Sequence, residues 1–375
     1  MSKISFVGDL CLKNPEEVNL SSTIRYILKE CEYNVLNFEA PLKSDDSCAI
    51  AKSGPALFQS DDSPEWIVNN GWNIISVANN HFADYGEKSI LKTLHAFENV
   101  FVIGGGYYSD SYKINTYVLS SGIKIGILAC CQKEFGALDS EDTSNRLGYA
   151  WICHPEIIRL IVEKKYEVDK LIVYAHAGVE RFPQPLPEWR KYYKFLIDLG
   201  CDAVVASHPH IIQGWEMYKG KPIIYSLGNF CFQKQSYNGD SSWLKSLMCV
   251  FDFSTNGELT FEMIPLIYDV KRGVIDVDSS ITSKKNIDNL NKVLNDNQLY
   301  DSFINLELPK EWKEYLHLFA NSDFRHSIFS HDMLSFIKRK MLGKKCDFTH
   351  LLNNLQNESH RWAIERIINV KYLNR

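Results

Sequence analysis

The sequence predicts an α/β protein in which strands and helices alternate along most of the chain. From residue 3 to about residue 265, short runs rich in Val, Ile and Leu alternate with longer segments of helical periodicity, which is the pattern of a layered α/β domain. Two predicted hairpins interrupt this alternation, so a sandwich with mixed sheets fits better than a purely parallel sheet. With 375 residues, the chain is long enough to bury a sizeable core.

Nine short apolar runs are predicted as strands because they are rich in β-branched residues and are bounded by turn residues. They span residues 4–7, 35–38, 74–77, 100–103, 117–120, 123–129, 171–175, 203–206 and 223–226. Turn residues at 120–122 separate the runs 112–119 and 124–130, and Asn256-Gly257 separates 247–253 from 259–265. Both patterns are typical of β-hairpins.

The composition changes after about residue 275, where Asn, Lys, Leu and aromatic residues recur at helical spacing. Apolar residues such as Ile287, Leu290 and Leu294 predict amphipathic helices. We therefore expect a main domain over residues 1–275 and a helical C-terminal region over residues 276–375. Within that region, residues 336–345 are basic and amphipathic. This stretch is either a solvated helix face or a contact with a membrane surface or an acidic partner.

Charge and cysteine usage narrow the class of protein. A formal net charge of −5 gives no overall attraction to nucleic acid, so we expect no nucleic-acid partner. The N-terminus reaches Asp9 after too few apolar residues to form a signal peptide, and no apolar run approaches the ~18 residues of a membrane span. The ten cysteines include no C-x-x-C pair and several lie in apolar runs, which predicts buried reduced thiols. These observations together predict a cytoplasmic location.

Polar clusters follow the predicted strands at points where the carboxyl ends of parallel strands would meet. Ligands bind at that edge of open α/β sheets, because loops converge there. The clusters are Gly8-Asp9, Asn37-Phe38-Glu39, Asn79-Asn80-His81, His176 and Ser207-His208-Pro209-His210.

These clusters predict a metal site. Side chains two residues apart on an extended chain point the same way, so His208 and His210 can reach one metal or two adjacent metals. Carboxylates, an amide oxygen and imidazoles suit Mn, Fe or Zn better than Ca or Mg. Each cluster alone has an ordinary explanation, such as a turn at Asp9 or a helix cap at Asn80. Their conjunction in one chain is hard to explain without a metal.

The motifs within residues 3 to 235 resemble the CapA family of the calcineurin-like metallophosphoesterase superfamily, which is associated with poly-γ-glutamate capsule synthesis. Besides the clusters already named, the resemblance rests on Asp84-Tyr85-Gly86, His176-Ala177-Gly178-Val179-Glu180, the continuation of the His-x-His motif through Gly214, and the run from Glu216 to Phe230.

The resemblance implies a four-layer α/β/β/α sandwich with a helical C-terminal appendage and a site for two divalent metal ions at the sheet edge. Carried over to this sequence, Asp9 and His210 would hold one ion, Asn80, His176 and His208 would hold the other, Glu39 would bridge both, and His81 would be the catalytic histidine.

One position departs from the superfamily pattern, which has Asp-x-His where this chain has Asp9-Leu10-Cys11. The first metal would therefore lack an imidazole, and a Cys11 thiolate is one possible substitute.

Other residues near the motifs are candidates for supporting roles. Arg181 and Arg190 are candidates for binding an anionic substrate, or else they form structural salt bridges. Asn229 would line the substrate pocket or stabilise a turn. Glu180 and Glu216 would orient ligand histidines by hydrogen bonding to the ring nitrogen that does not bind the metal, or they are ordinary surface or helix-capping carboxylates.

Three functional hypotheses share this site. The first is a metal-dependent hydrolase of the CapA type in capsule or exopolymer biosynthesis, in which two metals activate a water to attack an amide or ester. The second is a phosphoesterase acting on a cell-envelope precursor. The third is a non-catalytic metal-binding accessory protein of a polymer synthase. The expected partners are an anionic polymer or precursor and, through the C-terminal helices, a polymer synthase or membrane surface.

Overall fold

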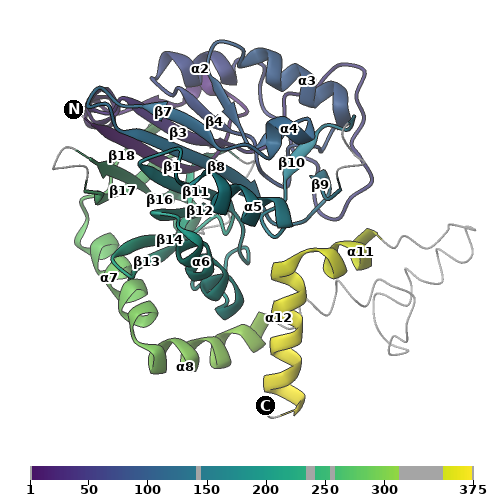
Figure 1. The fold of residues 1–375 in the computed structure, drawn as a ribbon, viewed down its shortest axis with the longest axis vertical. Helices are drawn as coiled ribbons and strands as arrows, with labels where there is room; N and C mark the ends of the chain where they lie inside the picture. Colours follow the sequence, from purple (N-terminus) through teal and green to yellow (C-terminus); the bar gives the residue numbers. More distant parts are fainter. Residues whose placement is uncertain (1, 141–144, 234–240, 254–257, 312–348, 374–375) are drawn as a thin grey trace, which may run out of the picture.

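The computed structural model describes residues 2–140, 145–233, 241–253, 258–311 and 349–373. Two sheets pack face to face, and helices cover their outer faces (Figure 1). This arrangement confirms the predicted α/β sandwich.

The larger sheet has nine strands and combines parallel with antiparallel pairs. Strands β1, β3, β4 and β5 run parallel, whereas β16 and β17 run antiparallel to their neighbours. In spatial order the strands are β2 (Asn19–Leu20), β18 (Val274–Val277), β17 (Thr260–Asp269), β16 (Lys245–Asp252), β1 (Lys3–Cys11), β3 (Tyr33–Phe38), β4 (Ile74–Ser76) and β5 (Phe101–Ile103), with β15 (Asn229–Phe232) beside the end of β1.

The second sheet has six strands, of which β14, β12, β11 and β8 are parallel. Its spatial order is β13 (Ile212–Tyr218), β14 (Lys221–Leu227), β12 (Ala203–Ser207), β11 (Lys170–His176), β8 (Lys124–Cys131) and β7 (Asn115–Val118). A small third sheet contains β6 (Gly105–Gly106), β10 (Gly148–Ala150) and β9 (Ala137–Leu138). Both predicted hairpins are confirmed, since β7 pairs with β8 and β16 pairs with β17 in antiparallel register.

Strand β11 shows why the core strands are apolar throughout. Its residues Ile172 and Tyr174 face the larger sheet, while Val173 and Ala175 face the helices on the opposite side. Because successive side chains point to opposite faces, a strand covered on both faces is apolar at nearly every position. The Tyr174 hydroxyl also donates a hydrogen bond to the carbonyl of Val7 in β1, which joins the two sheets directly.

Amphipathic helices form the outer layers. Ile24 and Leu28 of α1 are buried in the core cluster of the larger sheet, and Ile157 and Ile161 of α5 are buried in that of the second sheet. The helices before residue 275 are α1 (Ser22–Glu30), α2 (Ser63–Asn69), α3 (Gly86–Ala96), α4 (Tyr108–Ser111), α5 (Pro155–Lys164) and α6 (Pro187–Leu199), with short 3₁₀ turns at Pro15–Glu17 and Ser241–Leu244.

The described part of the C-terminal region is helical, as expected. It comprises α7 (Ile281–Asn295), α8 (Asn297–Glu307), a 3₁₀ turn at Leu308–Glu311, α11 (Thr349–Gln356), α12 (Glu358–Ile368) and a terminal turn at Asn369–Leu373. Leu294, Ile304 and Ile364 belong to the same buried cluster as the six-stranded sheet, so these helices share the main core. The expected boundary at residue 275 falls inside β18, and the basic stretch 336–345 lies outside the described residues.

Two further properties bear on the sequence predictions. Within the described ranges, no helix combines the length and apolarity that crossing a membrane requires. Of the nine cysteines in those ranges, seven are buried and none takes part in a disulfide.

The backbones of β1 and β15 approach each other closely beside Asp9, at the edge of the larger sheet where the polar clusters lie. A Cβ added to Gly8 would lie 1.8 Å from the carbonyl oxygen of Gly228, so only glycine fits at this point. The contact allows the amide of Asp9 to donate to that carbonyl at 3.2 Å. It also sets Asp9 opposite Asn229.

Candidate metal centre

Six predicted ligand residues come together at one edge of the two sheets. Each lies in a strand or in the loop that follows one, and all six side chains are buried. They are Asp9 in β1, Glu39 after β3, Asn80 after β4, His176 at the end of β11, and His208 and His210 after β12.

Asp9, Glu39 and His210 form a first group that could hold a metal ion. Each offers one ligand atom, and these atoms lie within 4.8 Å of one another. Nε2 of His210 is 3.6 Å from Oε1 of Glu39, and Nδ1 of His210 is 3.4 Å from Oδ2 of Asp9.

A second group forms around Nε2 of His176. This atom lies 3.1 Å from Oδ1 of Asn80 and 3.1 Å from Nδ1 of His208. It is also 3.9 Å from Oε1 of Glu39. Glu39 therefore lies between the two groups, in the arrangement that the resemblance implies.

The Glu39 carboxylate provides the clearest test of whether a cation fits. Both of its oxygens are buried and have no hydrogen-bond partner among the described residues. Burying an ionised carboxylate without compensation is costly. A divalent cation would supply that compensation, and the surrounding carboxylate, amide and imidazole donors suit Mn, Fe or Zn.

The pKa shifts of the buried carboxylates and of His210 also indicate that this cluster favours added positive charge. Burial and the neighbouring Asp9 raise the pKa of Glu39 well above its usual value. Burial alone would lower the pKa of His210, but Glu39 and Asp9 raise it to about 10. Burial would raise the pKa of Asp9, but His176 and His210 hold it well below its usual value. In the absence of a metal, the raised pKa values of Glu39 and His210 favour protonation of both groups.

The backbone of the His-x-His motif differs from the extended form assumed from the sequence. Strand β12 ends at Ser207, and His208 and His210 have φ angles of 99° and 61°. Such left-handed conformations are rare for residues other than glycine and are found at functional sites. The assumed geometry is therefore wrong at this motif. A tight turn, in which the amide of His208 donates to Oδ2 of Asp9 at 3.2 Å, sends the two rings into different groups.

His81 lies beside the cluster and is held by a carboxylate. Its Nδ1 is 2.6 Å from Oδ2 of Asp84 and 3.3 Å from Nζ of Lys52. Lys52 also forms a buried ion pair with Asp84. Burial and the Lys52 charge lower the pKa of His81. Asp84 belongs to a motif that marked the resemblance, whereas no sequence signal pointed to Lys52.

Asn229 contacts a predicted ligand directly. Its Oδ1 lies 2.9 Å from Nδ1 of His210, and its Nδ2 donates to the carbonyls of His210 and Trp243 at 3.2 Å each. These contacts orient the His210 ring so that Nε2 faces Glu39. The predicted contact between Asn229 and substrate stays a prediction.

Arg190 and Glu216 form an ion pair that the structure does not bring to the metal cluster. The guanidinium of Arg190 donates two hydrogen bonds of 2.7 Å to the Glu216 carboxylate. Arg190 also donates to the carbonyl of Leu294 at the end of α7, at 2.9 Å. For this pair the structure shows the salt-bridge alternative, because both charges are used to fasten α7 to the second sheet.

Arg181 and Glu180 lie on the loop after β11 and are exposed. The amide of Arg181 donates to the carbonyl of Pro209 at 2.8 Å, which ties this loop to the His-x-His turn. The charge of Glu180 adds to the rise in the pKa of Glu39 and of His210. Their predicted roles toward substrate and ligands stay predictions.

Cys11 does not join the ligand group. It packs against Phe232 and Trp243, and burial raises the pKa of its thiol to about 12. The register of β1 against β15 shifts between Asp9 and Leu10 because Phe230 of β15 has no partner on β1, and this shift leaves Cys11 opposite Phe232. A Cys11 thiolate ligand is therefore not supported.

Two supporting residues were missing from the predicted site. Nδ2 of Asn37 donates to Oδ1 of Asp9 at 2.8 Å. Gln132 follows β8, and its Nε2 lies 2.9 Å from Nε2 of His208. Because Gln132 stands directly after an apolar strand at the same edge, the reasoning applied to the other strand ends would have found it.

The fold and the cluster define an α/β sandwich protein with a candidate metal site at the sheet edge. The family model described as bacterial capsule synthesis protein PGA_cap matches residues 3–234, and the chain belongs to this family.

Two curated relatives carry names from the same family. The PGA biosynthesis protein CapA of Bacillus subtilis (strain 168) is 30% identical over 280 residues, covering 70% of this chain and 70% of that protein. The capsule biosynthesis protein CapA of Bacillus anthracis is 27% identical over 284 residues, covering 70% of this chain and 66% of that protein. Among solved structures, the sulfate thiohydrolase SoxB of Thermus thermophilus aligns with a TM-score of 0.42 at 6% identity, over 78% of this chain and 60% of that one.

Proposed function

We propose that this protein is a metal-dependent hydrolase in capsule or exopolymer biosynthesis. The observation that carries the proposal is the buried Glu39 carboxylate, which has no hydrogen-bond partner among the described residues and lies between two groups of metal-ligand side chains. When bound at such a site, divalent ions act as Lewis acids and lower the pKa of a coordinated water.

Two groups of ligand residues would each hold one metal ion. Asp9 and His210 would hold one ion, and the second would be held by Asn80, His176 and His208. Glu39 would serve both. Mn, Fe or Zn suits this donor set.

His81 is the proposed proton-transfer group. Because Asp84 holds its Nδ1, Nε2 remains the ring nitrogen that can exchange a proton with a reacting group. The lowered pKa of His81 favours the neutral imidazole at neutral pH, so Nε2 can accept a proton there.

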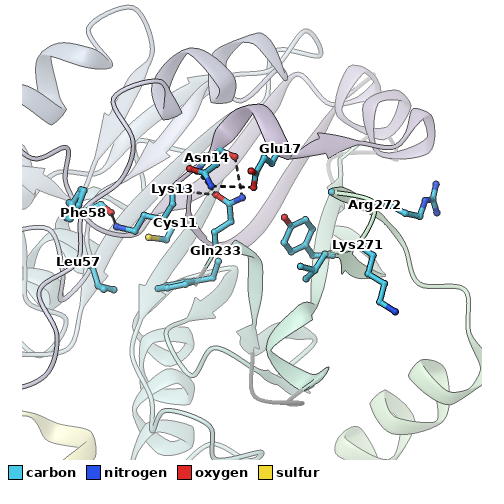
Figure 2. A pocket seen from close by; sticks show the side chains of 13 residues that line it. Cys11, Lys13, Asn14, Glu17, Leu57, Phe58, Gln233, Lys271 and Arg272 are labelled. Carbon is cyan, nitrogen blue, oxygen red and sulfur yellow. Dashed lines mark hydrogen bonds between the residues drawn. The ribbon is translucent and has the colours of Figure 1, made fainter. Parts of the chain in front are cut away.

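A groove beside the cluster supports an anionic, extended substrate. It has a volume of about 930 Å³ and includes Phe232 in its lining. The ring of that residue lies 5.2 Å from the ring of His210. Lys13, Lys271 and Arg272 contribute positive charge around the groove, as Figure 2 shows. A polymer or precursor that carries carboxylates would be attracted to these cations.

Metal analysis followed by parallel assays tests the proposal. The substrates are p-nitrophenyl phosphate, bis-p-nitrophenyl phosphate and γ-glutamyl peptides, each offered with Mn supplied. Hydrolysis of the peptides supports an amidase of the capsule type, while hydrolysis of the phosphates alone would make the protein a phosphoesterase. Bound metal without hydrolysis would favour an accessory role beside a polymer synthase, and absence of metal binding would contradict both enzymatic functions. Docking to a synthase or membrane and a cytoplasmic location stay predictions.

A further inference from the structure

We propose that Lys52 is a positioning residue for His81 and acts through the carboxylate of Asp84. Lys52 comes from the loop between β3 and α2, and its side chain is only 3% exposed. It is therefore placed to act on neighbouring protein groups and not on substrate. The inference rests on the proposed function, because it concerns the orientation of the proposed proton-transfer group.

The Asp84 carboxylate is buried, and both of its oxygens have partners. Oδ1 accepts a hydrogen bond from Nζ of Lys52 at 2.5 Å. Oδ2 accepts from the amide of Leu57 at 2.7 Å and lies 2.6 Å from Nδ1 of His81. Lys52 and Leu57, which belong to one short segment, thus hold the carboxylate in a single orientation against the His81 ring.

The contact between Asp84 and His81 decides which ring nitrogen carries the proton. An ionised carboxylate only accepts hydrogen bonds, so Nδ1 of His81 is the donor across the 2.6 Å contact. Nζ of Lys52 lies 3.3 Å from the same nitrogen, but an ammonium only donates and has its acceptor in Oδ1 of Asp84. With the proton on Nδ1, Nε2 keeps the lone pair that a proton acceptor needs.

The charge of Lys52 maintains this arrangement. A buried carboxylate is costly unless a cation and hydrogen bonds compensate it, and Lys52 is the cation that pairs with Asp84. If Lys52 were removed, Asp84 could take up a proton and donate it to Nδ1 of His81. The ring proton would then lie on Nε2, which could no longer accept one.

The segment that carries Lys52 joins the His81–Asp84 pair to the groove. The amide of Ile50 donates to the backbone carbonyl of Asp84 at 2.9 Å, which adds a third anchor to those of Lys52 and Leu57. Leu57 also lines the groove beside the metal cluster (Figure 2). Residues 50–57 therefore fix the proposed proton-transfer pair and form part of the groove wall.

A double-mutant cycle in the full-length protein tests the inference. Steady-state kinetics would compare Lys52→Met, Asp84→Asn and the double variant on whichever of p-nitrophenyl phosphate, bis-p-nitrophenyl phosphate and γ-glutamyl peptides the wild type hydrolyses. Lys52→Met should lower kcat by about 10-fold and leave KM and the bound metal unchanged. The double variant should be no slower than Asp84→Asn, because the two residues act in series. Loss of metal in Lys52→Met, or a raised KM at unchanged kcat, would contradict the inference.

Lys88→Met is the matched control. Nζ of Lys88 on α3 lies 3.6 Å from Oδ2 of Asp46, which belongs to the same loop as Lys52, but this pair is exposed. The control should therefore behave as the wild type.

The double variant also guards against misfolding. Removing one charge of a buried pair can prevent folding, whereas the double variant removes both charges. If Lys52→Met did not fold, the comparison of Asp84→Asn with the double variant would decide. A further fall in kcat of more than about twofold in the double variant would show that Lys52 acts by another route.

A readout without metal keeps this inference separate from the proposed function. At a pH where the ring is neutral, the ¹⁵N chemical shifts of His81 in the metal-free protein should place the proton on Nδ1. They should move toward the Nε2-protonated form in Lys52→Met and stay unchanged in Lys88→Met, and Asp84→Asn and the double variant should give the same shifts. If the wild type hydrolysed none of the substrates, the proposed hydrolase would fail. Unchanged His81 shifts in Lys52→Met, or different shifts in Asp84→Asn and the double variant, would overturn the role of Lys52 in either case.

Discussion

Oε1 of Glu39 lies 3.6 Å from Nε2 of His210, inside a cluster where neither oxygen of Glu39 has a hydrogen-bond partner among the described residues. Asp9 has what Glu39 lacks, since Nδ2 of Asn37 and the amide of His208 both donate to its carboxylate. The two carboxylates thus differ in how far protein donors alone satisfy them. Glu39 is the one that depends on a proton or a cation.

Glu39→Gln should stabilise the metal-free protein. Because burial raises the pKa of Glu39 above its ordinary value of 4.5, the folded state keeps this proton to higher pH than the unfolded state does. The free energy of unfolding should therefore fall as the pH rises above about 4.5 and until the raised pKa is passed. At pH 8 in EDTA we expect a gain of roughly 1–3 kcal/mol for the neutral side chain, measured by urea denaturation.

The same variant should lose its response to metal. Mn²⁺ at about 100 times its Kd should stabilise the wild type by about 2.7 kcal/mol and should have little effect on Glu39→Gln. Glu262→Gln, which changes an exposed carboxylate on β17, is the matched control and should behave as the wild type. A wild-type protein whose stability is the same in EDTA and in Mn²⁺ would argue against a metal at Glu39.

His81→Ala should abolish most hydrolysis and leave the metal in place. His81 is held by Asp84 and is not among the proposed ligands, so its removal should lower kcat by about 10²- to 10⁴-fold without changing the metal content. Asp84→Asn should lower kcat less, because the imidazole remains but loses its anionic partner. Steady-state kinetics with metal analysis checks both, and an unchanged kcat in His81→Ala would refute the proton-transfer role.

Asn229→Ala should weaken the metal group of Asp9, Glu39 and His210. The Asn229 amide fixes the His210 ring through Nδ1, and loss of such a contact costs about 10- to 100-fold in metal affinity. Titration with Mn²⁺ should show the loss in one of two binding steps. A uniform loss in both steps would show that the effect is not confined to His210.

Arg190→Met should destabilise the fold without impairing catalysis. Glu216 would lose its bidentate partner but keep Lys194, whose Nζ lies 3.0 Å from Oε2, so the loss should be smaller than the about 3–5 kcal/mol of a buried charge left unpaired. Burial would raise the pKa of Glu216, but Arg190 and Tyr225 hold it below its usual value, so the pair's contribution should be lost as the pH falls below about 4.5. Urea denaturation should show the loss, while kcat/KM of the folded fraction stays within about twofold. A larger fall in kcat/KM would restore the substrate-binding role that the sequence suggested for Arg190.

Much of the fold and the membership of the candidate metal cluster could be predicted from local patterns. The strands were recognisable because runs such as 171–175 are buried on both faces and therefore apolar throughout. The cluster was recognisable because parallel strands end at a common edge, so a polar residue directly after an apolar strand is placed there by the strand itself. Asp9, Glu39 and His176 follow this rule.

Tertiary structure decided which atoms meet. Glu216 begins a run that marked the resemblance and Arg190 lies between two such motifs, yet their ion pair holds α7 on the second sheet. No local pattern encodes that contact. Cys11 is two residues from Asp9, but it packs against Phe232 and Trp243, which come from distant segments of the chain. The Ser359 hydroxyl donates to Gln132, which is 227 residues away in the chain. The sequence by itself determined which side chains are candidate metal ligands and at which edge of the sheet they lie, because strand periodicity is local. The tertiary structure alone decided their orientation, because hydrogen-bond partners and buried charge pairs come from segments far apart in the chain.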